Sequence, residues 1–499
     1  MATTETDRPA AVQGEVRMLI DGELVEATSG KTFDNINPAT EEVLGPVADA
    51  SAEDMQRAIA AARRAFDETD WSTNHAFRKE CLLQLQAAIE SEQEEMRQEL
   101  VAEVGCPVAL TYGPQLDAPL GDALRWPAEY IDQFEWSRDL PNGTAFGGNS
   151  KRWVTREAAG VVGAIVPWNY PFEVSSQKIG QGLATGNTVI LKPAPDTPWN
   201  ATRIGRLVAE KTDIPPGVLQ VVTSSDHLVG EELTVSPLVD LISFTGSTAT
   251  GKRIFEKGGD TMKRLFLELG GKSADIVLDD ADLESKMGMA CMVAVHGGQG
   301  CVMATRMLVD RKIYDKAIEI AAPGFESFPY GDPNDMGNLM GPLVSKKQRE
   351  RVLGYIEKGR EEGARVVAGG GRPEQFDKGW FVQPTLFADV TNDMTIAREE
   401  IFGPVLIVIP FDGDDEAVRM ANDNQYGLGG YVTSGNEERA LAVGRQLRSG
   451  TVSINGGVTY GPDAPFGGYK ASGVGRQNGI EGFQQYTEVK TYGVNVPAE

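Results

Sequence analysis

Short apolar runs rich in β-branched residues alternate with helical patterns through the middle of the chain. The runs predict strands at 161–166, 188–191, 218–222, 238–244, 265–267 and 276–278. Between the runs, apolar residues recur every three or four positions, which predicts helices near 173–184, 199–211 and 248–257. Alternation at this pitch is typical of parallel βαβ units and favours a doubly wound α/β sheet. A second alternating series, from about 306 to 455, predicts another α/β lobe.

The first third of the chain is predicted to start with a hairpin and to continue as helices. Asp21-Gly22 is a turn signal between short apolar runs within residues 18–35. Ser51 and Asp54 have the spacing of a capping box, and the apolar positions that follow repeat at helical intervals up to Glu68. Two more helical stretches are predicted at 76–104 and 114–135.

Composition limits the classes of protein to which the chain can belong. Its 499 residues, 41% hydrophobic and 24% charged, are normal for a soluble globular enzyme. This length favours about three domains or lobes. The net charge of -25 disfavours nucleic acid as a partner and serves solubility. No run approaches the roughly 18 apolar residues of a membrane-spanning helix, so no membrane partner is expected.

The cysteines and histidines narrow the expected location and chemistry. Four scattered cysteines do not indicate a disulfide framework, and the start of the chain lacks the features of a secretory signal. We therefore expect a cytoplasmic protein. Neither the cysteines nor the three histidines have the spacing of metal ligands, so no metal site is predicted.

Cys301 and Glu268 are candidates for a nucleophile and a general base. Cys301 follows the glycine-rich segment 297–300, which would let a substrate approach the sulfur closely. Positive potential activates such a thiol by lowering its pKa. Glu268 lies between leucines at the end of a predicted strand, where burial would raise its pKa. Ordinary alternatives remain, because a cysteine is often buried filler and this carboxylate could be solvated or paired with Lys272.

Asn169 is a candidate oxyanion donor. It lies in the loop 167–171, which follows the predicted strand 161–166 at the end where open α/β sheets bind ligands. The loop sequence, PWNYP, contains two prolines that would hold the amide in a fixed place, as an oxyanion requires. The alternative is an ordinary structured loop.

Two other patterns bear on whether the chain could instead be an NTPase or a cysteine hydrolase. Segment 244–252 is predicted to be a strand, a glycine turn and a helix start, which favours phosphate binding. Arg253 stands where a P-loop NTPase needs Ser or Thr, and no GxGxxG fingerprint occurs. His296 precedes Cys301 by five residues, which leaves a Cys–His hydrolase open, although a lone histidine is more often structural.

Together these segments resemble the aldehyde dehydrogenase superfamily, in particular its non-acylating, NAD(P)-dependent branch. The likeness covers nearly the whole chain, with the motifs in the family's order. They are PWNYPF (167–172), GNTVILKPAPDTP (186–198), FTGST (244–248), LELGGK (267–272), GQGC (298–301), EEIFGPV (399–405) and PFGGYKASGVGR (465–476).

The resemblance implies oxidation of an aldehyde substrate to its carboxylic acid, with NAD or NADP as the cofactor. Cys301 would attack the aldehyde, and the Asn169 amide and the Cys301 backbone N–H would hold the thiohemiacetal oxyanion. After hydride transfer to the nicotinamide, Glu268 would activate the water that hydrolyses the thioester. Acylating relatives typically lack this glutamate, so a free acid is expected. An acylating or a catalytically silent member is the alternative.

The resemblance also assigns cofactor and substrate residues. Lys192 would bind the adenosine ribose, and Glu400 the nicotinamide ribose. The full cofactor set is Val166, Pro167, Trp168, Lys192, Pro195, Gly230, Phe244, Gly246, Ser247, Leu269, Glu400 and Phe402. The substrate tunnel would contain Tyr170, Val174, Gln177, Gly300 and Val302, with the loop 456–461. The tunnel residues are moderately apolar and include no arginine, which favours a neutral, medium-sized aldehyde.

Two positions depart from the family pattern. Pro195, followed by Asp196, stands where many NAD-preferring members have a glutamate that binds the adenosine ribose. Without that carboxylate, a 2′-phosphate would meet less repulsion, so NADP use is plausible. Gln477 stands where members often have a glutamate that forms a proton relay with a helix lysine, here Lys178. Glutamine cannot exchange a proton, so Glu268 would return its proton by another route.

The family plan has two doubly wound, Rossmann-like lobes and a β-arm for oligomerisation. The resemblance implies an NAD(P)-binding domain over 1–133 and 157–267, a catalytic domain over 268–473, and an arm over 134–156 and 474–499. A homodimer or homotetramer is expected.

Overall fold

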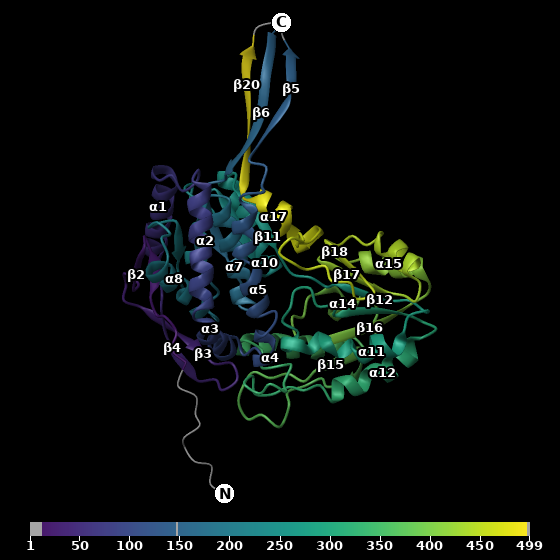
Figure 1. Ribbon diagram of the computed structural model, residues 1–499. Helices are drawn as coiled ribbons and strands as arrows, with labels where there is room; N and C mark the ends of the chain where they lie inside the picture. The colour runs from purple at the N-terminus through teal and green to yellow at the C-terminus, as the bar shows by residue number, and fades with distance from the viewer. Residues whose placement is uncertain (1–11, 146–147, 497–499) are drawn as a thin grey trace.

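The computed structural model describes residues 12–145 and 148–496, and it consists of two α/β units and a projecting arm (Figure 1). The first unit has an eight-stranded sheet in the order β19-β11-β10-β7-β8-β9-β1-β2. Its parallel strands are β7 (Val161–Ile165), β8 (Thr188–Lys192), β9 (Leu219–Val221), β10 (Leu241–Thr245) and β11 (Arg264–Glu268). The antiparallel strands at its edges are β1 (Met18–Ile20), β2 (Glu23–Val25) and β19 (Gly473–Val474).

Helices cover both faces of this sheet because its strands are apolar on both sides. In β7, Val161 belongs to one core cluster and Val162 to the other, as expected when successive side chains point to opposite faces. The helices on the Val161 face are α1 (Ala52–Glu68), α9 (His227–Val235) and α10 (Thr248–Gly258). Those on the Val162 face are α2 (His75–Glu90), α7 (Pro171–Ala184) and α8 (Trp199–Lys211). This is the doubly wound arrangement that the sequence predicts.

The second unit has a seven-stranded sheet in the order β14-β15-β16-β13-β12-β17-β18. The strands are β12 (Ala274–Val277), β13 (Arg306–Asp310), β14 (Arg365–Ala368), β15 (Thr385–Ala388), β16 (Val405–Phe411), β17 (Gly429–Thr433) and β18 (Thr451–Ile454). All neighbours are parallel except β14 and β15. One face is covered by α11 (Leu283–Gly288) and α12 (Tyr314–Glu326), and the other by α13 (Lys346–Glu361), α14 (Thr395–Arg398), α15 (Asp414–Asn422) and α16 (Glu437–Gly444). The predicted second lobe is therefore confirmed.

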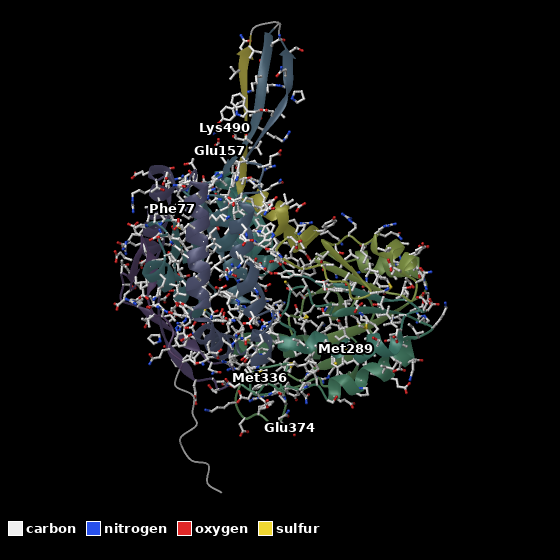
Figure 2. The ribbon with its side chains drawn as sticks, viewed as in Figure 1. Phe77, Glu157, Met289, Met336, Glu374 and Lys490 are labelled. Carbon is white, nitrogen blue, oxygen red and sulfur yellow. The ribbon has the colours of Figure 1, made fainter. Side chains whose placement is uncertain are left out.

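The arm is a three-stranded antiparallel sheet that extends from the body (Figure 1). It consists of β5 (Ser137–Ala145), β6 (Gly148–Ala158) and β20 (Thr487–Val496), with β6 in the middle. Lys490 and Glu157 form an ion pair between β20 and β6 near the base of the arm (Figure 2). Helix α17 (Gly479–Gln485) lies in the range predicted for the arm, but its Phe483 is buried in the core of the first unit.

Several predicted elements are confirmed, and two are wrong in length. Helix α1 begins with the predicted capping box, and β1 and β2 form the predicted hairpin. The stretch 76–104 is broken after Glu90 into α2, α3 (Gln93–Glu99) and a π-helical turn (Leu100–Val104). The stretch 114–135 forms only two short helices, α5 (Asp117–Asp122) and α6 (Arg125–Tyr130). Both short helices contain a proline, and proline removes a backbone donor that a longer helix would need.

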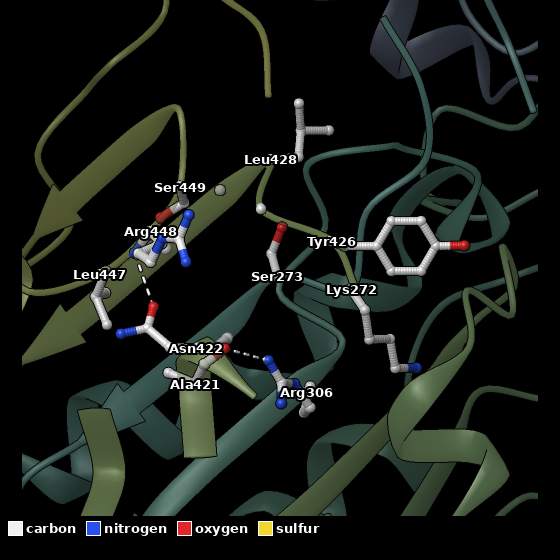
Figure 3. Close-up of a pocket in the computed structure, with 14 residues that line it drawn as sticks. Lys272, Ser273, Arg306, Ala421, Asn422, Tyr426, Leu428, Leu447, Arg448 and Ser449 are labelled. Carbon is white, nitrogen blue, oxygen red and sulfur yellow. Dashed lines mark hydrogen bonds between the residues drawn. The ribbon is translucent and has the colours of Figure 1, made fainter. Parts of the chain in front are cut away.

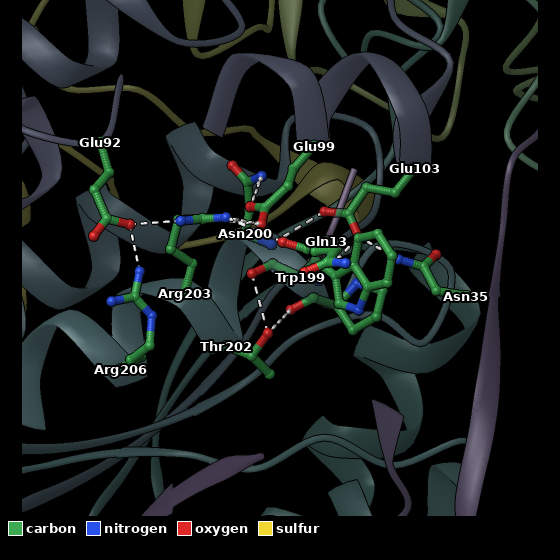
Figure 4. Close-up of polar contacts among 11 residues, drawn as sticks. Gln13, Asn35, Glu92, Glu99, Glu103, Trp199, Asn200, Thr202, Arg203 and Arg206 are labelled. Carbon is green, nitrogen blue, oxygen red and sulfur yellow. Dashed lines mark hydrogen bonds and ion pairs between the residues drawn. The ribbon is translucent and has the colours of Figure 1, made fainter. Parts of the chain in front are cut away.

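After the break near Glu90, a buried polar cluster joins α3 and the π-helical turn to α8, through Glu99 and Glu103 (Figure 4). Helix α8 has no capping side chain at Pro198. Instead, the Glu103 carboxylate accepts hydrogen bonds from the backbone N–H groups of Trp199 (2.9 Å) and Asn200 (3.1 Å). Burial raises the pKa of Glu103 to about 8. The carboxylate thus satisfies donors at the start of α8 from a distant part of the sequence.

Within residues 12–145 and 148–496, no helix is both long enough and apolar enough to cross a bilayer. The first eleven residues of the predicted NAD(P)-binding domain, and residues 146–147 and 497–499 of the predicted arm, lie outside the described residues.

Candidate active site

A cavity of about 720 Å³ opens where the carboxyl ends of the first sheet face the second unit. Loops that follow β7, β10 and β11 contribute Pro167–Tyr170, Gly246-Ser247 and Leu269-Gly270 to its lining. The second unit contributes residues 300–303, together with Ser345, Lys347, Gln348, Arg351, Glu400 and Phe402, among others. Ligands of open α/β sheets bind at this end of the strands, so the cavity is the expected place for a functional site.

Cys301 reaches this cavity through a sharp change of chain direction. Helix α11 stops at Gly288, and a 3-10 segment (Ala290–Gly298) follows it. His296, Gly297 and Gly298 all have positive φ angles. A Cβ atom on Gly298 would lie 2.0 Å from the Gly403 carbonyl oxygen, so only glycine fits there.

The Cys301 thiol meets Glu268 across the cavity. Its Sγ donates a hydrogen bond to Glu268 Oε1 at 3.6 Å. Glu268 is the last residue of β11 and is only 5% exposed, and its Oε2 accepts a hydrogen bond from Thr245 Oγ1 at 3.2 Å. Burial raises the pKa of Glu268, while the nearby charge of Lys178 opposes that rise. The two candidate residues from the sequence are therefore brought into direct contact.

The electrostatic environment of the thiol differs from the expected positive potential. Burial raises the pKa of Cys301 well above its usual range, and the carboxylates of Glu268, Glu400 and Glu173 raise it further. A free thiol in this arrangement is neutral, so it needs a base to become a nucleophile. Glu268 is the base in contact with it.

Asn169 is held against the loop that carries Cys301. Its side-chain Nδ2 donates a hydrogen bond to the Gln299 carbonyl oxygen at 2.8 Å, which occupies one of its two hydrogens. The His296 Nε2 lies 2.9 Å from the Asn169 backbone oxygen, and Gln115 Nε2 donates to the same oxygen at 3.0 Å. The amide side chain is therefore fixed in the lining of the cavity.

The position of His296 argues against a Cys–His hydrolase. Burial lowers the pKa of His296 to about 4, so the ring is neutral, and Nε2 must carry the proton in order to bind a carbonyl oxygen. That nitrogen faces Asn169, whereas the Cys301 thiol faces Glu268. His296 holds the two loops together rather than activating the thiol.

Lys178 lies near Glu268 and contacts Gln477. The Lys178 Nζ donates hydrogen bonds to Ser243 Oγ at 2.9 Å and to Gln477 Oε1 at 3.5 Å. It also sits 4.5 Å from the centre of the Phe266 ring. Burial lowers the pKa of Lys178 to about 7. Its amine can therefore change protonation state near neutral pH, whereas its amide partner cannot.

At the other end of the cavity, groups suited to a nucleotide come together. Gly246 and Ser247 line the cavity at the start of α10, where Ser247 is the N-cap residue. Glu400 Oε1 accepts a hydrogen bond from the Gly271 backbone N–H at 2.9 Å. The rings of Trp168 and Phe402 pack edge to face, with centres 5.4 Å apart.

The cavity collects most of the residues singled out from the sequence. Those in its lining are Pro167, Trp168, Asn169, Tyr170, Val174, Gln177, Gly246, Ser247, Glu268, Leu269, Gly300, Cys301, Val302, Glu400 and Phe402. Those outside its lining are Val166, Lys192, Pro195, Gly230 and Phe244. Lys192 is buried nearby, and its Nζ donates hydrogen bonds to the carbonyl oxygens of Pro193 and Ser224.

Several polar residues of the lining were missed from the sequence, namely Glu173, Asp196, Thr245, Lys347, Gln348 and Arg351. Glu173 could have been found, because it shares the helical spacing of the expected tunnel residues Tyr170, Val174 and Gln177. Asp196 and Thr245 lie within the motifs 186–198 and 244–248 but were not assigned to the site, whereas Lys347, Gln348 and Arg351 come from a segment that had no distinguishing pattern.

A second, smaller pocket lies beside the Gly270-Gly271 turn and contains Lys272 and Arg306 (Figure 3). Its lining includes no thiol and no carboxylate among the described residues. The Lys272 Nζ is buried without a hydrogen-bond partner in the described part of the chain, so the suggested pairing of Glu268 with Lys272 is wrong. Burial lowers the pKa of Lys272 to about 7.

Comparison with known proteins places this site in a family. The model of the aldehyde dehydrogenase family matches residues 24–492. A 3-succinoylsemialdehyde-pyridine dehydrogenase from a Pseudomonas species is 42% identical over 476 residues, which are 94% of this chain and 97% of that protein. A mitochondrial aldehyde dehydrogenase from Leishmania tarentolae is 41% identical over 488 residues, 97% of this chain and 95% of that protein. The NAD+ complex of an aldehyde dehydrogenase from Bacillus cereus superposes with a TM-score of 0.93 at 40% identity, covering 98% of each chain.

Replacing Glu268 by glutamine is expected to make the Cys301 thiol more acidic, because it removes a negative charge and a carboxylate acceptor that both raise the thiol's pKa. The pH midpoint for alkylation of Cys301 by iodoacetamide should move to lower pH in Glu268→Gln. Mass spectrometry of the Cys301 peptide measures this, and Cys301→Ala gives the background from the three buried cysteines. A midpoint that stays unchanged or rises would contradict the electrostatic account.

Proposed function

The chain belongs to the aldehyde dehydrogenase family and oxidises an aldehyde to its carboxylic acid with NAD, and we propose that Cys301, Glu268 and Asn169 perform the chemistry. The observation that carries this proposal is the contact between Cys301 Sγ and Glu268 Oε1, at 3.6 Å within a shared cavity. A nucleophile and a base from different units meet there, beside a fixed amide donor.

The first step forms a covalent bond between the thiol and the aldehyde. Glu268 accepts the thiol proton as the Cys301 sulfur attacks the carbonyl carbon, which turns the carbonyl oxygen into an oxyanion. The Asn169 amide has one hydrogen on Gln299 and a second one for the oxyanion. Because the amide is already fixed, little reorganisation is needed when the charge develops.

NAD fits the end of the cavity where α10 begins. A Cβ atom on Gly246 would lie 2.5 Å from the Phe244 ring, so no side chain separates the start of the helix from the cavity. The Gly246 N–H already donates to the Glu268 carbonyl oxygen at 3.0 Å, so the Ser247 N–H would be the donor to the pyrophosphate, with Gly246 leaving room for it. Glu400, Trp168 and Phe402 would hold the nicotinamide ribose and ring. Bound NAD supplies the hydride acceptor for the oxidation.

Hydrolysis of the resulting thioester releases the acid. Glu268 first releases the thiol's proton to solvent and then takes a proton from water, whose oxygen attacks the thioester carbon. The bond to the Cys301 sulfur breaks, and the sulfur leaves as a thiolate that takes up the proton held by Glu268. Thr245 donates a hydrogen bond to Glu268, and the Lys178 charge favours its ionised form, so the carboxylate is available as a base. The presence of Glu268 disfavours an acylating member, and the contact between Cys301 and Glu268 disfavours a catalytically silent one.

Two substitutions test these roles with an aldehyde panel and NAD. Cys301→Ala should form no NADH, because no thiol remains to be acylated. Glu268→Gln should form NADH roughly 10²–10⁴-fold more slowly, because both the deprotonation of the thiol and the hydrolysis of the thioester lose their general base. Rapid-mixing absorbance at 340 nm and mass spectrometry of the acyl-enzyme measure both effects. Full turnover by folded Cys301→Ala would contradict the assignment.

We also infer that the enzyme accepts NADP beside NAD. Pro195 provides no carboxylate, and the cavity at that end contains Asp196 together with Lys347. Burial raises the pKa of Asp196, and the charges of Lys347 and Lys192 lower it. The two lysines would offset the repulsion that Asp196 exerts on a 2′-phosphate.

Adding a carboxylate at position 195 should increase the selectivity for NAD over NADP. In Pro195→Glu, the kcat/KM ratio of NADP to NAD is expected to fall about tenfold, because a second negative charge would repel the 2′-phosphate. Pro195→Gln is the matched control, since it changes size and backbone freedom without adding charge. Equal ratios in the two variants would show that charge at position 195 does not set the preference.

The arm is proposed to join copies of this chain into a homodimer or homotetramer in the cytoplasm. Its outer strands, β5 and β20, have unpaired edges, and Val489 and Val494 are more than half exposed. Light scattering should give two or four times the 53.8 kDa chain mass. Val489→Lys with Val494→Lys should lower that mass, whereas Lys490→Arg should not. A wild-type protein with the mass of one chain would contradict the proposal.

A further inference from the structure

A carboxylate without a cationic partner lines the cavity on the substrate side of Cys301. Glu173 belongs to α7, and it lines the cavity on the same helical face as Val174 and Gln177. Its Oε1 accepts hydrogen bonds from Tyr460 Oη at 2.5 Å and from Gln177 Nε2 at 3.4 Å. Gln177 Nε2 also donates to Tyr460 Oη, at 2.6 Å. Three polar groups from α7 and the 456–461 loop therefore surround one point in the tunnel.

The second oxygen of this carboxylate has no partner. Both hydrogen bonds end on Oε1, and none to Oε2 occurs among the described residues. No lysine or arginine of residues 12–145 or 148–496 lies within ion-pair distance of Glu173. Glu173 is only partly buried and lines the cavity, so its carboxylate is accessible to a ligand. An ionised carboxylate without a cationic partner attracts a positively charged group.

The cations of this cavity lie at its other end. Arg351 donates hydrogen bonds to the carbonyl oxygens of Glu400 and Ile401, and Lys347 interacts with Asp196. Lys178 is on the same helix as Glu173, but its amine points to Ser243 and Gln477. The titratable groups that face Glu173 are Tyr460, Glu268, Cys301 and Tyr170. None of these brings a positive charge.

We propose that Glu173, Tyr460 and Gln177 form a subsite for the protonated amino group of an ω-amino aldehyde. This inference rests on the proposed function, because the subsite acts only if the aldehyde reaches Cys301. An ammonium group donates charge-assisted hydrogen bonds, so it would bind the free Oε2 of Glu173 and the lone pairs of the Tyr460 oxygen. A chain of methylene groups would span the apolar part of the tunnel. The neutral aldehyde expected from the sequence would leave the carboxylate unpaired.

The titration of Glu173 gives the subsite a pH dependence. Burial raises the pKa of Glu173 to about 7, and Glu268 raises it further while the Tyr460 hydrogen bond opposes the rise. Because only the ionised form attracts an ammonium group, preference for an amino aldehyde should increase as the pH rises through about 7. It should fall again where the substrate amine loses its proton, near pH 10.

Aldehydes matched in length test the subsite. The measurement is kcat/KM for 3-aminopropanal against butanal and for 4-aminobutanal against pentanal, with 4-oxobutanoate as the anionic member. The wild type should prefer the ammonium member of each pair. Glu173→Gln keeps the side-chain size and should reduce that preference, taken as the ratio of the two kcat/KM values within each pair, about ten- to a hundredfold. Tyr460→Phe should reduce the preference less, and the exposed Glu374→Gln serves as the control (Figure 2).

Failure of the subsite and failure of the proposed function give different results. An enzyme that oxidises aldehydes but has the same ammonium preference in Glu173→Gln as in the wild type would overturn the subsite alone. A wild type that prefers butanal or 4-oxobutanoate would do the same. If no aldehyde is oxidised, calorimetry with n-butylammonium and 1-butanol decides the question without turnover. Binding of the ammonium probe that Glu173→Gln weakens supports the subsite, and equal binding overturns it.

Discussion

The contact between Glu268 and Cys301 joins the two units at the place where both sheets end, and the rest of the site depends on it. Glu268 is fixed because it is the last paired residue of β11, opposite Gly473 of β19. Gly473 has a positive φ, and a Cβ atom there would lie 1.9 Å from the Leu267 carbonyl oxygen. Cys301 is fixed by the turn at Gly298, which packs against Gly403. Backbone constraints in both units, rather than flexible side chains, therefore hold Cys301 against Glu268.

Negative charge dominates the surroundings of the thiol. The carboxylates of Glu268, Glu400 and Glu173 all raise the pKa of Cys301, whereas the charge of Lys178 acts on Glu268 and lowers its pKa. Such a site disfavours a resting thiolate and favours ligands that bring positive charge. A nicotinamide ring in its oxidised form would be such a ligand on one side of the thiol. An ammonium group at the proposed subsite would be another on the opposite side, so both ligands would lower the cost of forming the thiolate.

Sequence patterns predicted the features that depend on local periodicity or on whole motifs. The alternating apolar runs predicted the parallel strands of the first sheet and the presence of a second α/β lobe, and helix α8 has the predicted bounds. The family motifs led to Cys301 and Glu268, which the fold brings together from 33 positions apart. Contacts that join distant segments left no such pattern. The support of Asn169 by His296 spans 127 positions, and the bond between Glu173 and Tyr460 spans 287, so neither could be predicted from spacing.

Two carboxylates, the fully buried Glu103 and the half-buried Glu173, show how a structural acid differs from one that is placed to bind a ligand. Burial raises the pKa of both Glu103 and Glu173. In Glu103, however, both oxygens accept hydrogen bonds, from Asn35 and from the N-terminal backbone of α8, and the group completes the protein's own hydrogen bonding. In Glu173 one oxygen accepts every hydrogen bond, and the residue lines an open cavity. Both carboxyl groups have a raised pKa. Of the two, only Glu173 has an oxygen that accepts no hydrogen bond from the described residues and that belongs to the lining of a cavity. Unused hydrogen-bonding capacity is therefore the sharper sign of a binding site, and it is the reason why Glu173 rather than Glu103 is assigned to a ligand.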